Sequence, residues 1–278
     1  MPPQPLEPFC TAILRTLRRS LIPPNLPRPL PAHTHTAKSH DKTKSPSESA
    51  ILIPLMNIRD QPHILMEVRG KGLRVHAGEV SFPGGKADKT DDSLIHTALR
   101  ETQEELSIPT SHVEILGMLE PEYSLGNKSR VWPFVGFIHS DPQPFPSIPQ
   151  TLPSLPLSQI TPNPDEVSSI ITLPLSALRD PQKLAVHYFR LNLNRPYYRV
   201  GVQDYMIDKE HTTKTNTLRK DEKKIDGGEN PIRSVGVEEN GESSEKLEVW
   251  GLSGWFLNRL AQRAGWLDSP PKGVSPED

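Results

Sequence analysis

The stretch that decides the fold is "SFPGGKADKTDDSLIHTALRETQEELSI", residues 81–108. It opens with an aromatic residue, a proline and two glycines, passes through a polar loop, and closes with apolar residues at helical spacing. That spacing predicts a helix from Ser93 to Leu106. Asp91 or Asp92 would be its N-cap, since a short carboxylate can accept a hydrogen bond from the first-turn N–H groups.

Three glutamates crowd one side of this predicted helix. Glu101, Glu104 and Glu105 stand at positions i, i+3 and i+4, which are neighbours on a helix surface. Two unit charges about 4 Å apart repel by roughly 4 kcal/mol at an effective dielectric of about 20. Either the side chains form a solvated acidic face, or they bind a hard cation such as Mg²⁺ or Mn²⁺, which prefers carboxylate and phosphate oxygens.

The residues before the acidic cluster favour the cation. Gly84 and Gly85 lack a Cβ, so their backbone N–H groups can approach a phosphate closely. Gly85 lies fifteen residues upstream of Arg100, directly after Gly84. Arg100 is adjacent to Glu101 and is expected to face away from Glu104, orienting a carboxylate or fixing the loop by a bidentate contact.

These residues resemble the signature of the Nudix hydrolases, G-x5-E-x7-R-E-U-x-E-E-x-G-U with U apolar. The alignment places Asp92 at the family's first glutamate, so that six residues instead of five follow Gly85. Ser107 replaces the family's glycine and would fit a left-handed helix end less easily. The resemblance implies an α/β fold, a Nudix-type α/β/α sandwich with a mixed β-sheet.

The same resemblance implies a metal-dependent enzyme, with Mg²⁺ or Mn²⁺ as the cofactor. Glu101 and Glu105 would be the firmest metal ligands, and Glu104 a ligand or the base that positions water. Glu104, Glu105 and Arg100 are the predicted catalytic residues. Bound ions would neutralise a diphosphate, activate a water and stabilise the leaving oxygen.

A second motif lies directly upstream. The segment "LMEVRGKGLRVHAGEVSFPGG", residues 65–85, is similar to L-L-T-x-R-S-x3-R-x3-G-x3-F-P-G-G of the coenzyme A pyrophosphatase branch. The matching positions are Arg69, Arg74, Gly78, Phe82, Pro83, Gly84 and Gly85. Of these, the residues predicted to bind substrate are Arg69, Arg74, Gly78, Phe82, Gly84 and Gly85. Glu67 replaces threonine and Gly70 replaces serine. The later segments "NPDEV", "RVGVQDY" and "VWGLSGW" also resemble that branch.

This second resemblance implies hydrolysis of coenzyme A, with acyl or oxidised forms as further candidates, to 3′,5′-ADP and 4′-phosphopantetheine or its derivative. Arg69 and Arg74 would bind the phosphates through planar donors, or else form surface salt bridges. Phe82 is expected to pack in the core rather than stack on adenine. Asp165 and Glu166 are either a further metal ligand or base, or N-cap residues.

Two other functions stay open at this point. One is a Nudix hydrolase for another diphosphate, such as ADP-ribose, NADH or a nucleoside triphosphate. The other is a non-catalytic module that binds a nucleotide or a partner, although the three glutamates that such a module could lose are retained.

The rest of the chain is expected to fall into three parts. Residues 1–47 would form an amphipathic helix and a linker rich in proline and histidine, and residues 267–278 a disordered tail. Residues 48–266 would form the Nudix domain, with a Pro-rich insertion at 142–164 and a charged, disordered insertion at 208–248. Strands are predicted at 50–56, 63–69, 113–119 and 131–138, strands again within 187–202, and helices near 174–179 and after 250.

Composition limits the remaining alternatives. The chain has 278 residues, of which 31 are proline and only 34% are hydrophobic, which favours one domain with unfolded insertions. The net charge of −2 argues against nucleic acid or a membrane surface as a partner, and no apolar run approaches the ~20 residues of a span. A single cysteine, Cys10, excludes an internal disulfide framework. A soluble intracellular protein is expected, the resemblance implying the peroxisome, with cytoplasm and mitochondrion left open.

Overall fold

The computed structural model describes residues 6–24, 47–73, 76–124, 129–143, 151–207 and 247–270. The α-helices are α1 (Thr11–Ser20), α2 (Leu94–Leu106) and α3 (Gly251–Arg263). The strands are β1 (Ser47–Ile58), β2 (Gln61–Arg69), β3 (Val80–Ser81), β4 (Gly84–Lys86), β5 (Val113–Met118), β6 (Glu122–Tyr123), β7 (Ser129–Ile138), β8 (Val167–Pro174), β9 (Leu184–Tyr188), β10 (Pro196–Gly201), β11 (Met206–Ile207) and β12 (Glu248–Val249). Short 3₁₀ turns are η1 (Thr110–His112), η2 (Leu157–Gln159), η3 (Leu175–Arg179), η4 (Pro181–Lys183), η5 (Phe189–Leu191) and η6 (Gln203–Tyr205).

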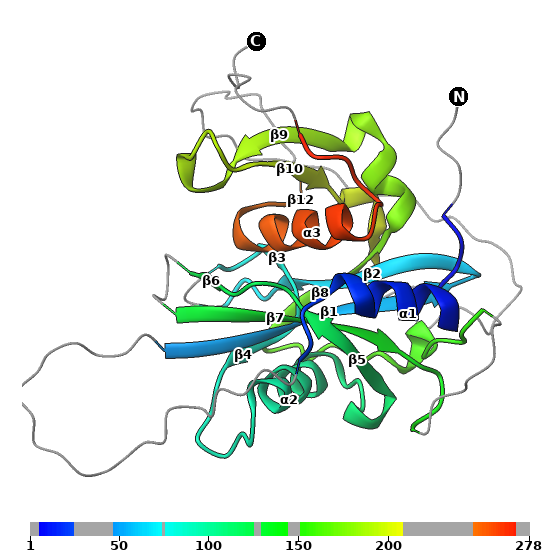
Figure 1. The fold of residues 1–278 in the computed structure, drawn as a ribbon. Helices are drawn as coiled ribbons and strands as arrows, with labels where there is room; N and C mark the ends of the chain where they lie inside the picture. Colours follow the sequence, from blue (N-terminus) through cyan, green and yellow to red (C-terminus); the bar gives the residue numbers. More distant parts are fainter. Residues whose placement is uncertain are drawn as a thin grey trace, which may run out of the picture.

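One mixed sheet organises the molecule (Figure 1). Its strand order is β11-β8-β2-β1-β7-β5, with β3, β4 and β6 paired at the ends of β2, β1 and β7. The central strands β1 and β7 run parallel, whereas β1 pairs antiparallel with both β2 and β4. The short strand β4 therefore lies beside the start of β1, and this position carries the two glycines of the sequence motif.

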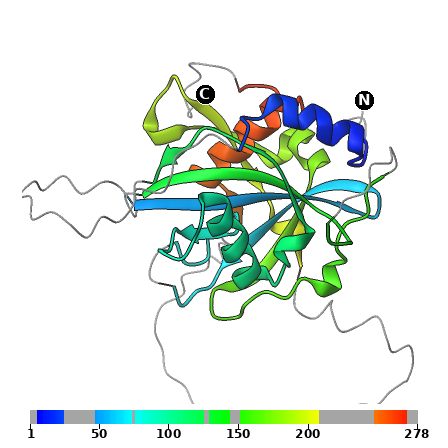
Figure 2. The same cartoon turned by 60° about the horizontal axis from the view of Figure 1, so that its bottom comes forward.

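Both faces of the sheet are buried, because β1 alternates its side chains between two apolar layers. Ala50, Leu52 and Met56 pack into the layer that α2 covers. Ile53 and Leu55 pack into the opposite layer, together with residues of α1 and α3. Figure 1 shows α2 below the sheet and α1 and α3 above it, and Figure 2 brings α2 forward across β1. This arrangement is the expected α/β/α sandwich with a mixed sheet.

A second, three-stranded sheet of order β12-β10-β9 carries α3. The Asn258 side chain accepts a hydrogen bond from the N–H of Tyr198 and donates one to its carbonyl, both at 2.8 Å. The hydroxyl of Tyr197 accepts a hydrogen bond from the N–H of Gly251 at 2.9 Å. Three hydrogen bonds thus fix α3 on β10, one at its first residue and two at its middle.

Most predicted elements coincide with observed ones within a few residues, and three details differ. The segment near 174–179 is the 3₁₀ turn η3 rather than an α-helix, since it is only five residues long and follows a proline. Ser93, rather than Asp91 or Asp92, is the N-cap of α2, its hydroxyl accepting from the N–H of His96 at 3.1 Å. In the Pro-rich segment, Leu152, Leu155 and Ile160 are buried in the core, so its second half packs on the domain.

The linker histidines, the charged insertion up to residue 246 and the last eight residues lie outside the described parts of the chain. Within the described parts, none of the helices has the length and apolar character needed to cross a membrane.

Candidate active site

Strand β4 and helix α2 meet at the site, and the two glycines make that contact close. The N–H of Gly84 donates to Oε2 of Glu105 at 2.8 Å. A Cβ built on Gly85 would lie 2.5 Å from Cδ of Glu101, which is closer than carbon atoms can approach. Gly85 therefore leaves the space in which Glu101 sits, and Gly84 holds Glu105 through its N–H group.

A buried glutamate of β2 extends the carboxylate cluster. Glu67 has no exposed surface, and Ser81 Oγ donates to its Oε1 at 3.0 Å. Its Oε2 is buried and has no hydrogen-bond partner among the described residues. Burial raises the pKa of Glu67, and the charge of Arg69 partly offsets this rise. An unpaired buried carboxylate oxygen is costly, so it marks a place where a cation would be stabilised.

The carboxylates Glu67, Glu101 and Glu105 act on one another. Burial, followed by the negative charge of Glu67, raises the pKa of Glu105, which is only 2% exposed. Burial likewise raises the pKa of Glu101, whose neighbouring Arg100 opposes the rise. Mutual repulsion of this kind is relieved when a divalent ion binds between carboxylates.

The donor set fits a hard cation. It consists of oxygen atoms alone, as Mg²⁺ and Mn²⁺ prefer, and it includes the unpaired Glu67 oxygen. Among the described residues, no three His, Cys, Asp or Glu side chains already converge as a finished metal cluster. Glu101 and Glu105 would hold the ion, and the remaining ligands would come from substrate oxygens and water, which is common for Mg²⁺.

Arg100 links three carboxylates, and this corrects one expectation. Its Nε and Nη2 donate to Oδ1 and Oδ2 of Asp91 at 2.9 and 3.1 Å. Nη2 also lies 2.9 Å from Oε1 of Glu101. The prediction that Arg100 faces away from Glu104 is wrong, since Nη1 donates to Oε2 of Glu104 at 2.9 Å, the i,i+4 distance that a long side chain spans easily.

The acid that Arg100 holds is Asp91, not Asp92. The Asp91 side chain is fully buried and also accepts from Thr97 Oγ1 at 2.8 Å, whereas the Asp92 side chain is 96% exposed. The Arg100 hydrogen bonds lower the pKa of Asp91 to about 2. Five residues separate Gly85 from Asp91, so the loop length of the family signature is kept and the extra residue lies between Asp91 and Arg100.

The end of α2 follows the signature in conformation, although not in residue type. Ser107 has φ 57 and ψ 26, the left-handed conformation in which the family has glycine, and its N–H donates to the carbonyl of Gln103 at 2.9 Å. A non-glycine residue there costs about 1 kcal/mol. The exposed Glu104 and the buried Glu105 therefore keep the relative positions that the signature requires.

The upstream motif contributes Arg69 directly. Its Nη1 lies 3.6 Å from Oε1 of Glu67 and 3.8 Å from Oε1 of Glu105, and the side chain is 25% exposed. Gly78 has φ 76, and its N–H donates to the carbonyl of Arg69 at 3.0 Å, which closes the turn behind that arginine. Phe82 is 2% exposed and packs in the core. Arg74 lies outside the described residues.

The "NPDEV" segment supports the site through its backbone. The N–H of Gly70 donates to the carbonyl of Glu166 at 2.7 Å, and a Cβ on Gly70 would lie 3.2 Å from that oxygen. This close approach explains why glycine replaces the serine of the branch pattern. The N-cap interpretation of Asp165 and Glu166 is wrong, because strand β8 follows them instead of a helix. The charge of Glu166 acts on both Glu67 and Glu101.

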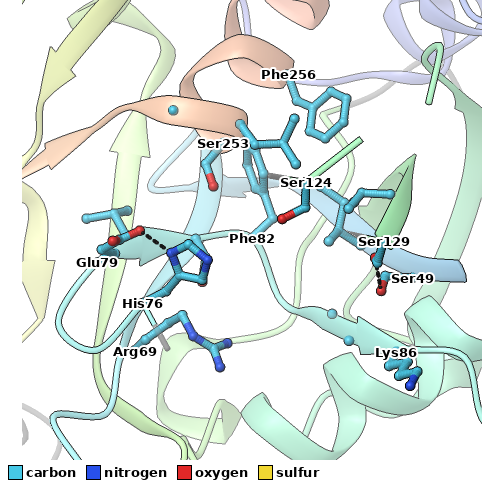
Figure 3. A pocket seen from close by; sticks show the side chains of 18 of the residues that line it. Ser49, Arg69, His76, Glu79, Phe82, Lys86, Ser124, Ser129, Ser253 and Phe256 are labelled. Atoms are coloured by element: carbon cyan, nitrogen blue, oxygen red, sulfur yellow. Dashed lines mark hydrogen bonds and ion pairs between the residues drawn. The ribbon is translucent and has the colours of Figure 1, made fainter. Parts of the chain in front are cut away.

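A pocket of about 460 Å³ opens beside these groups (Figure 3). Its lining includes Gly84 and Gly85 on one side and residues of α3 on the other. Arg69 and Lys86 lie toward the α2 side of the view, and Ser253 and Phe256 lie opposite them. The full lining is Ser47, Ser49, Ile51, Arg69, His76, Glu79, Val80, Ser81, Phe82, Gly84, Gly85, Lys86, Ser124, Ser129, Val131, Trp250, Gly251, Leu252, Ser253 and Phe256.

Sequence reasoning missed two contributions to this site. Glu67 was noted only as a departure from a pattern, yet a lone acid within the apolar run "HILMEVR" was a usable signal, because a buried charge needs a partner. The contribution of α3 to the pocket was not predicted: "VWGLSGW" was noted only for its resemblance to the coenzyme A branch, and the tertiary fold brings its residues beside those of 69–86.

The site thus combines a mixed sheet with a carboxylate-bearing helix packed against a glycine strand. The chain belongs to the Nudix hydrolase family: the NUDIX domain model matches residues 46–191. Its relatives include proteins named Uncharacterized Nudix hydrolase NudL. That of Pectobacterium atrosepticum is 37% identical over 152 residues, 55% of this chain and 68% of the relative. That of Yersinia pestis (strain Pestoides F) is 46% identical over 113 residues, 41% of this chain and 54% of the relative.

The similarity to solved structures is more distant. A Nudix hydrolase from M. smegmatis, RenU, aligns over 48% of this chain and 74% of its own, with 13% sequence identity and a TM-score of 0.36. The family assignment therefore rests on the sequence matches. The family model ends at residue 191, so β10, β11, β12 and α3 lie outside the part of the chain that it matches.

Proposed function

We propose that the protein hydrolyses the diphosphate bond of coenzyme A, and of its acyl or oxidised forms, to 3′,5′-ADP and 4′-phosphopantetheine or its derivative. One water is added across the P–O–P linkage, so that each product keeps one of the two phosphates. The observation that carries the proposal is the 3.8 Å approach of Arg69 Nη1 to Glu105 Oε1. It places an arginine of the coenzyme A-type motif beside a carboxylate of the Nudix helix.

The chain's own groups have separable tasks in this reaction. Glu101 and Glu105 would hold Mg²⁺ or Mn²⁺, which when bound supplies charge neutralisation and a more acidic water. Arg69 is placed to donate to a phosphate oxygen, and Lys86 adds a second positive charge to the same pocket. Arg100 positions Glu101 and Glu104 while it is held by Asp91.

Glu104 is the candidate for proton transfer. Its side chain is 55% exposed, whereas that of Glu105 is 3% exposed, so Glu104 can reach water while Glu105 stays fixed. Its partner Arg100 limits the directions in which it can move. A general base must come within hydrogen-bond reach of the proton that it abstracts, and the exposed position of Glu104 favours it over Glu105 for this role.

The experiment that tests the proposal is a substrate panel on the purified full chain. Coenzyme A, ADP-ribose, NADH and nucleoside triphosphates are incubated with Mg²⁺ or Mn²⁺, and the products are resolved by chromatography. Fastest release of 3′,5′-ADP from coenzyme A, abolished by Glu105→Gln, is the expected result. Faster cleavage of another diphosphate would leave the metal site standing and reject coenzyme A. A fully inactive wild type would favour a binding module.

The compartment stays a prediction from the resemblance. The two relatives named above are bacterial proteins, and bacteria lack peroxisomes, so these two give the peroxisome no support. Fractionation of cells that express the chain with an internal tag decides between peroxisome, cytoplasm and mitochondrion.

A further inference from the structure

The pocket beside the carboxylates is divided chemically. Its charged and titratable lining side chains among the described residues are Arg69, His76, Glu79 and Lys86, and all come from residues 69–86. Figure 3 shows Arg69 and Lys86 on the side of α2, with Ser253 and Phe256 of α3 across the pocket. One side therefore suits phosphates and the other an uncharged group.

The wall across the pocket consists of Trp250, Gly251, Leu252, Ser253 and Phe256, which we name the α3 wall. None of these side chains carries a charge. The hydroxyl of Ser253 and the indole N–H of Trp250 are the only side-chain hydrogen-bonding groups of the wall. Trp250 is 46% exposed although it is the largest apolar residue of the wall. A large ring that stays half in solvent at a pocket mouth is well placed to be covered by a ligand.

The α3 wall is rigid, so it can select by shape. Gly251 has φ 60, and its N–H donates to the Tyr197 hydroxyl at 2.9 Å. A Cβ on Gly254 would lie 2.8 Å from Cε2 of Tyr197, so the helix can approach β10 this closely only with glycine there. A preformed wall loses little conformational entropy when a ligand binds.

The α3 wall also lies outside the part of the chain that the family model matches, which ends at residue 191. The metal carboxylates lie inside that part. The predicted metal ligands and Arg69 therefore come from the family-matched segment, whereas the uncharged wall comes from a segment beyond it.

We propose that the α3 wall binds the uncharged, non-nucleotide arm of a diphosphate ester, and that Trp250 and Leu252 contact an apolar group at the end of that arm. This inference rests on the proposed function. In a coenzyme A substrate the arm is the pantetheine chain, and the apolar group is the acyl chain of a thioester. The two residues then determine specificity, because they add binding energy only for substrates that carry the acyl group.

The first test separates the two halves of the substrate. Binding of octanoyl-4′-phosphopantetheine and of 3′,5′-ADP to the full chain is measured by calorimetry for wild type, Trp250→Ala and Leu252→Ala. Each substitution is expected to weaken binding of the octanoyl compound by roughly tenfold and to leave 3′,5′-ADP binding unchanged. Trp250→Phe, which keeps an aromatic ring, should retain most of the affinity.

A matched control removes an exposed apolar side chain elsewhere. Leu193 is 59% exposed and does not line the pocket, so Leu193→Ala should change neither affinity. Thermal unfolding of each variant identifies loss of fold, and Leu252→Ala carries the test if Trp250→Ala proves unstable.

The second test compares turnover of octanoyl-coenzyme A with that of free coenzyme A. Wild-type cleavage of either substrate supports the proposed function, and a tenfold fall in kcat/KM confined to octanoyl-coenzyme A in Trp250→Ala supports the inference. Octanoyl-arm binding that is unchanged in both wall variants overturns the inference, whatever the turnover result. Absence of turnover in the wild-type protein would instead reject the proposed function. The binding of octanoyl-4′-phosphopantetheine would then still show whether the α3 wall binds the arm.

Discussion

The guanidinium of Arg100 donates a hydrogen bond to each carboxylate oxygen of Asp91, from Nε to Oδ1 at 2.9 Å and from Nη2 to Oδ2 at 3.1 Å. The loop between β4 and α2 is thereby tied to the helix that carries the carboxylates. The same guanidinium contacts Glu101 and Glu104, so the loop and the predicted catalytic groups share one positioning residue.

Asp91→Asn should destabilise the protein, and Asp92→Asn should not. The first change removes a buried charge from a bidentate ion pair, a loss of about 1.5–3 kcal/mol for hydrogen bonds to charged groups. The second changes a side chain that is 96% exposed. Urea unfolding at neutral pH measures both free energies. Equal losses in the two neighbours would contradict the assignment of Asp91 as the partner of Arg100.

Asp91 should also contribute to acid sensitivity. Its pKa is lowered from 3.8 to about 2 by the Arg100 hydrogen bonds, so its stabilising effect is complete above 3.8 and is lost as the pH falls toward 2. Unfolding free energy measured over this window should fall less steeply in Asp91→Asn than in wild type. Parallel curves would show that another carboxylate dominates.

The metal-free protein should lose stability as the pH rises. Burial raises the pKa values of Glu67 and Glu105 above the ordinary 4.5, so the folded state binds protons more tightly than the unfolded state. The stabilising effect of these protons is complete below 4.5 and is lost as the pH rises through the elevated folded-state pKa values. Added Mn²⁺ should oppose this loss, because it binds the deprotonated carboxylates.

Melting temperatures at about pH 5 and about pH 8, with EDTA or with Mn²⁺, measure this effect. Glu67→Gln should reduce the difference between the melting temperatures at the two pH values in EDTA. It should also weaken Mn²⁺ binding by roughly 3- to 10-fold, since it removes one charge from the cluster. Glu79→Gln is the matched control, because Glu79 lines the same pocket but pairs with His76. An identical response of the two variants would argue against a role for Glu67 in cation binding.

The glycines of β4 should separate activity from stability. Gly85→Ala places a Cβ 2.5 Å from the Glu101 carboxylate, so it should displace a predicted metal ligand and lower kcat by roughly 100-fold or more while the fold survives. Gly84→Ala meets the Ala50 backbone oxygen at 2.4 Å with φ 148, and should mainly lower the melting temperature. Gly72→Ala, with nothing within 4 Å, is the control. Full activity in Gly85→Ala would contradict the proposed role of Glu101 as a metal ligand.

The predictable part of the fold is the part with local signals. The periodic pattern located α2 almost to the residue, and apolar runs located β1, β2, β5 and β7. The N-cap was misassigned because Asp91, Asp92 and Ser93 are all good capping residues, and the tertiary contact with Arg100 withdraws Asp91 from that role. Local sequence does not contain that contact.

In the candidate site, too, the residues close together in sequence were predicted, and those brought in by the tertiary fold were not. Glu101, Glu105, Gly84 and Gly85 lie within one short stretch, so spacing alone brought them together. Glu67 comes from a different strand, and its proximity depends on the pairing of β2 with β1 and β3. The α3 wall depends on the packing of α3 against β10, and the resemblance of "VWGLSGW" to the coenzyme A branch did not locate that packing.

The composite pocket has a consequence for synthesis of the protein on the ribosome. Helix α2, which supplies the metal carboxylates, leaves the exit tunnel long before Trp250 and Phe256 are translated. A nascent chain that has folded its family-matched region would hold the carboxylates beside a pocket that lacks its far wall. If the α3 wall binds the uncharged arm as proposed, its residues join the carboxylates only after the C-terminal segment has been translated and has folded onto the domain.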